Sequence, residues 1–235
     1  MMLLNKNQLK LDAKRILQTA KPNPVLIGLL FVSVTLLMDY LSANLLGGNI
    51  TESAMQKYYN MIQNGKLDAA VEYAQGLMPS APSTIINAAI KLVRWIITAG
   101  FVIFILNTIR GTGTACAGNL LDGFEIFGRV FCLNLLKAIL IIIGCVFFVI
   151  PGIILAYAYR QSIYLLIDHP ELGPIQCLKE SRMMMRGHKW ELFGLDLSFI
   201  GWFLLESIVG PVAVWVAPYT NVTWALYYQA LCEQQ

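Results

Sequence analysis

The chain of 235 residues is 57% hydrophobic and only 13% charged, with a net charge of +3. Soluble domains carry about 25% charged residues, so this composition indicates that lipid surrounds most of the chain. A net charge this small, with no separate basic domain, excludes nucleic acid as an expected partner. The apolar runs are continuous and several approach the roughly 20 residues that cross a bilayer as a helix, which favours an all-α membrane bundle over a β-barrel.

Cysteine and histidine usage predicts neither a metal site nor a cofactor. The five cysteines are irregularly spaced and form no C-x-x-C motif, and the chain has only two histidines. The sequence also contains neither G-x-S-x-G nor H-E-x-x-H. We therefore expect no catalytic residues, no metal, no cofactor and no enzymatic activity.

Residues 1–22 predict a short amphipathic helix on the cytoplasmic side. Basic residues alternate at helical spacing with apolar ones, which are Leu9, Ala13, Ile16, Leu17 and Ala20. The apolar run that follows is too long for a signal-peptide core, so we expect it to be retained as an anchor.

Six transmembrane spans are predicted. In chain order they cover about 24–46, 86–109, 130–149, 152–168, 192–209 and 211–231. Residues 49–82 form a polar extracytoplasmic loop, in which we expect two short helices separated at Asn64-Gly65. Residues 169–191 form a second polar segment, which predicts a cytoplasmic amphipathic helix opened by Pro174 and ended near Gly187.

The apolar stretch between Lys137 and Arg160 has two possible topologies, because Pro151-Gly152 lies in the middle of its 22 uncharged residues. If the stretch is one bent span, the two sides of the membrane receive seven Lys and Arg residues each. If it is two antiparallel spans with Pro151-Gly152 at the outer tip, the cytoplasmic side receives eleven and the outer side two. Because cytoplasmic loops carry the excess of Lys and Arg, the count favours the helical hairpin. Both termini are then cytoplasmic.

Charged residues inside the spans form a candidate polar cluster, since intramembrane charges tend to face the bundle interior and to pair. Its members are Lys137, Arg160, Asp196, Glu206 and Asp39. Depth predicts an inner layer in which Asp196 lies near Lys137 and Arg160, and an outer layer in which Asp39 and Glu206 lie near Lys91 and Arg94. One interpretation is a pathway or pocket for an ion or a lipid head group; the other is a set of pairing charges that fixes the order of the helices.

The helix expected in 169–191 is a candidate membrane-surface or lipid-contact element. Its exposed residues are predicted to be Lys179, Arg182, Arg186, His188 and Trp190, with Ile175, Leu178 and Met185 on its apolar face. Cations at this position suit anionic lipid or a cytoplasmic partner, and the tryptophan suits the interface. The alternative is a surface helix that only sets the topology.

Several blocks resemble one bacterial family of multi-pass membrane proteins, the domain of unknown function 975. They are LDGFEIFGRV, the stretch from VIPGIILAYAYRQSIYLLIDHP to GHKWELFGLDLSFIGW, WVAPYTNVTWALYY and the opening LKLDAKRIL. The resemblance covers nearly the whole chain except 49–82 and implies an integral protein of about six helices in a bacterial cell membrane. It implies no activity.

A looser likeness, in Pro151, Gly152, Arg160, Gly187 and Trp190, is to the membrane domain attached to some glycerophosphodiester phosphodiesterases. The catalytic domain of those enzymes has no counterpart here, so only an association with lipid is implied. We therefore expect a non-enzymatic scaffold or accessory factor in envelope or lipid homeostasis. The alternative is a small transporter that uses the charged layer. Membrane lipids are the expected partners, and a further membrane or cytoplasmic protein is left open.

Overall fold

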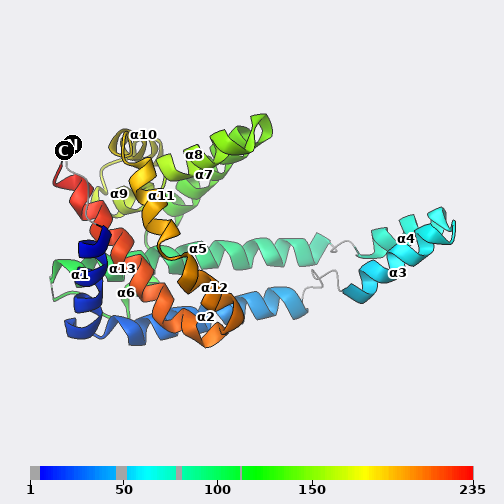
Figure 1. The fold of residues 1–235 in the computed structure, drawn as a ribbon, viewed down its shortest axis with the longest axis horizontal. Coiled ribbons are helices and arrows are strands. Elements are labelled where there is room, and N and C mark those ends of the chain that lie inside the picture. The colour runs from blue at the N-terminus through cyan, green and yellow to red at the C-terminus, as the bar shows by residue number, and fades with distance from the viewer. Residues whose placement is uncertain (1–5, 46–51, 78–80, 112, 235) are drawn as a thin grey trace. The chain divides into compact units, whose positions relative to one another are not determined.

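The computed structural model describes residues 6–45, 52–77, 81–111 and 113–234. These residues form helices and no strands (Figure 1), which confirms the all-α fold. The chain divides into two compact units, a smaller one of residues 33–94 and a larger one of residues 1–32 with 95–235. Each unit is described by itself.

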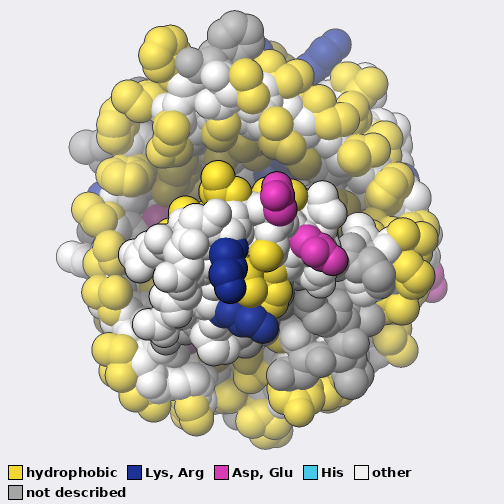
Figure 2. Space-filling model, turned by 90° about the vertical axis from the view of Figure 1, so that its right-hand side faces the viewer, with side chains coloured by type: hydrophobic (Ala, Val, Ile, Leu, Met, Phe, Trp, Pro, Cys, Tyr) yellow, Lys and Arg dark blue, Asp and Glu magenta, His cyan; other side chains and the backbone are white. Residues whose placement is uncertain are grey.

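Four helical segments of the described chain are long and apolar enough to cross a membrane. They are Pro24–Ala43, Ala81–Arg110, Phe127–Val146 and Val149–Asp168. Large apolar side chains such as Ile142, Val146 and Ile208 are exposed, and Figure 2 shows many hydrophobic side chains at the surface. Exposed apolar area on this scale marks a membrane-contacting surface.

The larger unit holds most of the helices. It contains α1 (Lys6–Thr19), the beginning of α2 (Pro24–Leu45), the end of α5 (Ala81–Arg110), α6 (Asn119–Asp122), α7 (Phe127–Phe147), α8 (Val149–Ala158), α9 (Ser162–Asp168), α10 (Pro174–Met184), α11 (Lys189–Leu197), α12 (Ile200–Ile208), the 3₁₀ turn η1 (Gly210–Val212) and α13 (Ala213–Cys232). Its core is built around α13, where Val222, Ala225 and Tyr227 are fully buried and Tyr228 stacks on Tyr164 with ring centroids 5.1 Å apart.

Helix α1 lies beside α13 (Figure 1), and the buried side chains Leu9, Ala13 and Leu17 join the common core. The amphipathic pattern of the N-terminal segment is therefore present, but protein covers its apolar face. Lys10 on the other side donates to the carbonyl of Ser198 at 3.0 Å and lies 4.3 Å above the ring of Phe199. Burial, with Lys14 nearby, lowers the pKa of Lys10.

The two last predicted spans have different structures. Residues 192–209 are not one helix, because α11 ends at Leu197 and α12 begins at Ile200. Residues 213–232 are one continuous helix, although Pro218 lies inside it. Neither segment is among the four helices that meet the length and hydropathy of a span, so their crossing of the membrane stays a prediction.

Helices α7 and α8 form a hairpin and lie side by side (Figure 1). The chain reverses at Phe148, which has an extended backbone with φ −162° and ψ 148°. Pro151 is the third residue of α8, where a missing N–H breaks no helical bond. The tip thus lies three residues before the predicted Pro151-Gly152 position, and Gly152 instead serves the contact between the arms, packing on Gly144 and Cys145.

The smaller unit contains α3 (Glu52–Gln63) and α4 (Leu67–Leu77) together with parts of α2 and α5. The helices α3 and α4 lie side by side within the segment expected to be a polar loop (Figure 1). Gly65 between them has a φ of +69°, which favours glycine. Lys57 of α3 lies 4.7 Å above the ring of Tyr73 of α4. Parts of the predicted loop, 49–51 and 78–80, lie outside the described residues.

Candidate functional site

Asp196 on α11 is the centre of a polar cluster in the larger unit. Its Oδ1 accepts a hydrogen bond from the indole N–H of Trp224 at 2.8 Å, and its Oδ2 accepts one from the hydroxyl of Tyr157 at 3.1 Å. Arg160 lies 3.8 Å from the same Oδ2. Because these groups come from α11, α13, α8 and the turn after α8, the carboxylate connects several segments that are distant in sequence.

Arg160 lies in the turn between α8 and α9 and is held mainly by Trp224, whose ring centroid is 4.3 Å from the guanidinium carbon. The ion pair with Asp196 is longer than a hydrogen bond, and the side chain of Arg160 stays 33% exposed. Cation–π stacking leaves the edge of the guanidinium free to donate.

Lys137 on α7 lies near Arg160. The close contact of Gly144 with Gly152 sets the register of the two arms, and counting seven residues from each glycine brings Lys137 opposite Tyr159. At this position Lys137 feels the like charge of Arg160, and among the described residues it forms no ion pair or hydrogen bond. The inner layer predicted from the sequence, Lys137, Arg160 and Asp196, is therefore brought together.

The other two members of the predicted cluster lie elsewhere. Asp39 pairs with Arg94 inside the smaller unit, as the predicted outer layer has it. Glu206 lies half-exposed on α12 and makes no ion pair with any residue that the structure describes. The prediction that Glu206 shares a layer with Asp39 joins residues of different units and is not addressed by either unit alone.

The basic residues predicted to contact the membrane surface are exposed. Lys179 and Arg182 lie on α10, and Arg186 follows the end of that helix. The predicted apolar face was wrong in part: Leu178 and Met185 are buried, but Ile175 is 60% exposed, because the packed face follows Cys177, Leu178 and Ser181. Burial raises the pKa of the Cys177 thiol, which keeps it protonated.

His188 was predicted to contact the membrane surface, but protein encloses most of its side chain. Its Nδ1 lies 2.8 Å from Oε2 of Glu191, and both side chains are nearly buried, at 12% and 11% exposure. Its carbonyl accepts a hydrogen bond from the Tyr227 hydroxyl at 3.0 Å, so His188 anchors α11 to α13. Trp190, by contrast, is 80% exposed, as an interfacial residue would be.

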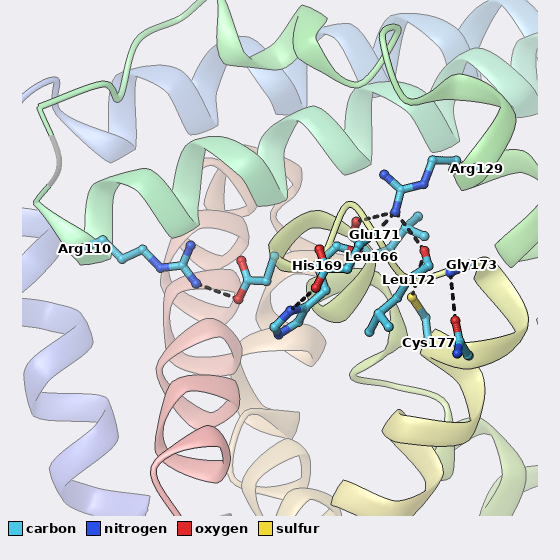
Figure 3. A network of polar contacts seen from close by, with 10 residues as sticks. Arg110, Arg129, Leu166, His169, Glu171, Leu172, Gly173 and Cys177 are labelled. Atoms are coloured by element: carbon cyan, nitrogen blue, oxygen red, sulfur yellow. Dashed lines mark hydrogen bonds and ion pairs between the residues drawn. The ribbon is translucent and has the colours of Figure 1, made fainter.

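A second network, at the end of α9, was not predicted (Figure 3). The Nη2 of Arg129 donates to the carbonyls of Leu166, His169 and Leu172 at 3.3, 3.3 and 3.0 Å. These carbonyls belong to the last turn of α9 and the loop after it, where helices leave acceptors unpaired. Arg129 on α7 therefore caps the C-terminal end of α9 and orders the loop that leads to α10.

Arg110 at the end of α5 pairs with Asp168 of α9 at 2.6 Å (Figure 3). From the sequence, Arg110 and Arg129 were counted only as charges that set the topology. No local pattern points to their partners, because each partner lies at least 37 residues away in the chain. The sequence signal for these two residues is their position beside an apolar run, where a charged side chain can pair with groups at a helix end.

Comparison with protein-family models matches residues 139–235 to the family described as "Protein of unknown function (DUF975)". The matched region contains Arg160, Asp196 and Trp224. No curated protein and no solved structure matches the chain. The likeness of the segments before residue 139 to the same family stays a prediction. Residues 139–235 are thus similar to the family of unknown function 975.

Proposed function

We propose that this membrane protein is a non-enzymatic scaffold or accessory factor in envelope or lipid homeostasis, placed in a bacterial cell membrane with both termini cytoplasmic. The observation that carries the proposal is the use of Asp196, whose two oxygens are engaged by Trp224, Tyr157 and Arg160. A carboxylate committed to holding helices together is a structural element, and it has little capacity left to exchange protons or bind a moving cation.

Two further contacts support the same role. Arg110 with Asp168, and Arg129 with the carbonyls after α9, connect α5, α7 and α9. Charged groups satisfied by partners within the protein favour one fixed arrangement of helices.

The second candidate is a small transporter for anions, and one observation favours it: Lys137 and Arg160 are neighbouring cations, and Arg160 is partly exposed. The purified protein in sealed liposomes distinguishes the two. A scaffold gives no flux of radiolabelled phosphate or chloride above that of protein-free liposomes. Flux that Arg160→Leu abolishes, while the variant remains folded, would contradict the scaffold.

A further inference from the structure

The base of the α7–α8 hairpin carries one positive charge more than its partners neutralise. Lys137 and Arg160 are two neighbouring cations, and among the described residues only one carboxylate, that of Asp196, pairs with either of them. Asp196 is already the acceptor for Tyr157 and Trp224, which reduces what it offers to Arg160. An anion from outside the chain would balance this charge.

The hydrogen-bond donors at the base also lack partners among the described residues. A guanidinium has five N–H donors, and that of Arg160 makes no hydrogen bond to any described residue. Trp224 covers one of its faces and leaves the donor edge open, with the side chain 33% exposed. A planar fork beside an ammonium group is the arrangement that phosphate oxygens bind.

The depth of this base in the membrane follows from its contacts with α10. The Ser181 hydroxyl donates to the carbonyl of Ala158 at 2.8 Å, and the Gln161 side chain reaches the sulfur of Met185 at 3.8 Å. Helix α10 therefore lies level with Arg160. Because α10 exposes Lys179 and Arg182, and the turn after it exposes Arg186, this helix lies at a membrane surface, and the hairpin base lies there with it.

The tip of the hairpin is apolar and exposed. From Val146 to Ile150 the described side chains are exposed by 67% to 78%, and all are apolar. The α8 arm has 10 residues and so rises about 15 Å, half of the roughly 30 Å of hydrocarbon. With the base at the surface, the tip ends near the middle of the bilayer. Exposed Trp190, which meets the ring of Phe193 edge to face beside Tyr157, fits the interface at the base.

We propose that Lys137 and Arg160 bind the phosphate group of an anionic phospholipid, with the α7–α8 hairpin inserted among the acyl chains of the same leaflet. Length and composition alone allow both arms to cross the membrane, but the contacts with α10 place the two cations at head-group depth. An anionic lipid matches the excess charge, whereas a zwitterionic lipid brings a cation of its own. The site is additional to the scaffold role and does not depend on it.

Thermal unfolding in nanodiscs tests the site. Wild-type protein in phosphatidylcholine is titrated with phosphatidylglycerol, and the rise in Tm gives an apparent affinity. Lys137→Gln should weaken that affinity about fivefold to tenfold, whereas Lys137→Arg should retain it. Without phosphatidylglycerol, Lys137→Gln should unfold at or above the wild-type Tm, because Lys137 has no partner to lose among the described residues and repels Arg160.

Lys179→Gln is the matched control, since it removes the same charge from the exposed face of α10. Equal loss of affinity in Lys179→Gln and Lys137→Gln would show diffuse attraction to the membrane and overturn the site. An unchanged response in Lys137→Gln would overturn it as well. The last measurement adds inorganic phosphate to phosphatidylcholine nanodiscs. If phosphate raises the Tm as phosphatidylglycerol does, the occupant is a free anion and the lipid assignment fails. None of these results depends on anion flux, which tests the scaffold.

Discussion

Gly152→Ala tests how closely the two arms of the hairpin pack. A Cβ at position 152 would collide with the Cys145 sulfur and would lie 3.1 Å from the backbone nitrogen and 3.2 Å from the Cα of Cys145. The sulfur can rotate away, but the backbone atoms cannot, so the arms must separate. Overpacking of this kind costs roughly 1–3 kcal/mol, and alanine regains about 0.5–1 kcal/mol of helix propensity. The difference is a net destabilisation of up to about 2.5 kcal/mol.

Gly128→Ala is the control for this experiment, because Gly128 lies in the other arm of the hairpin, α7, and an added Cβ there meets nothing within 4 Å. It should stabilise the protein by about 0.5–1 kcal/mol through helix propensity alone. The assay is unfolding by SDS in mixed micelles, followed by tryptophan fluorescence. Adding Cys145→Ala to Gly152→Ala should restore only part of the loss, since the backbone contacts remain. If Gly152→Ala were as stable as Gly128→Ala, the close packing of the arms would be wrong.

Two further substitutions test the polar contacts, and a labelling experiment tests the packing of α10. Asp196→Asn should lower the free energy of unfolding by about 1–3 kcal/mol, because it removes the charge beside Arg160 and one acceptor position; an unchanged Tm in detergent would contradict its connecting role. Arg129→Met leaves three carbonyls without their donor and should speed amide hydrogen exchange in the loop after α9, whereas unaltered exchange there would show that Arg129 does not order it. Cys177, buried and with a raised pKa, should react with maleimide only on unfolding, while exposed Cys116 reacts at once; equal rates would refute the packing of α10.

Local patterns were sufficient to predict the helices and the hairpin. Apolar length and the distribution of Lys and Arg led to two antiparallel arms around Pro151-Gly152, and the structure has a reversal nearby. Its position at Phe148 was not predictable from the proline, because the first turn of a helix accepts proline as readily as a turn does. The division of 192–209 into α11 and α12 was not predictable, since the stretch is mostly apolar and has no proline, and the contact of Lys10 with the break is a tertiary one.

The candidate site was predictable in its charges and not in its aromatic residues. Depth along the spans suggested Arg160 beside Asp196, and the structure places them 3.8 Å apart. Trp224 and Tyr157 were not anticipated, because an aromatic residue in an apolar helix gives no sign of whether it packs against lipid or against a charge. For the same reason His188 was assigned to the surface, although its pairing with Glu191 at i+3 was visible in the sequence.

The depth of the hairpin tip decides between a lipid site at the membrane surface and a charged layer in the middle of the bilayer. In a chain whose five cysteines are replaced by serine or alanine, Ile150→Cys puts one thiol on the exposed tip, and Met183→Cys puts a reference thiol on the exposed face of α10. Membrane-impermeant maleimide is applied to both sides of sealed vesicles. Cysteine at position 183 should react from one side, and cysteine at position 150 should react from neither side until detergent is added. Labelling of position 150 from the side opposite position 183 would show that the hairpin crosses the membrane and would contradict the placement of Lys137 and Arg160 among the head groups.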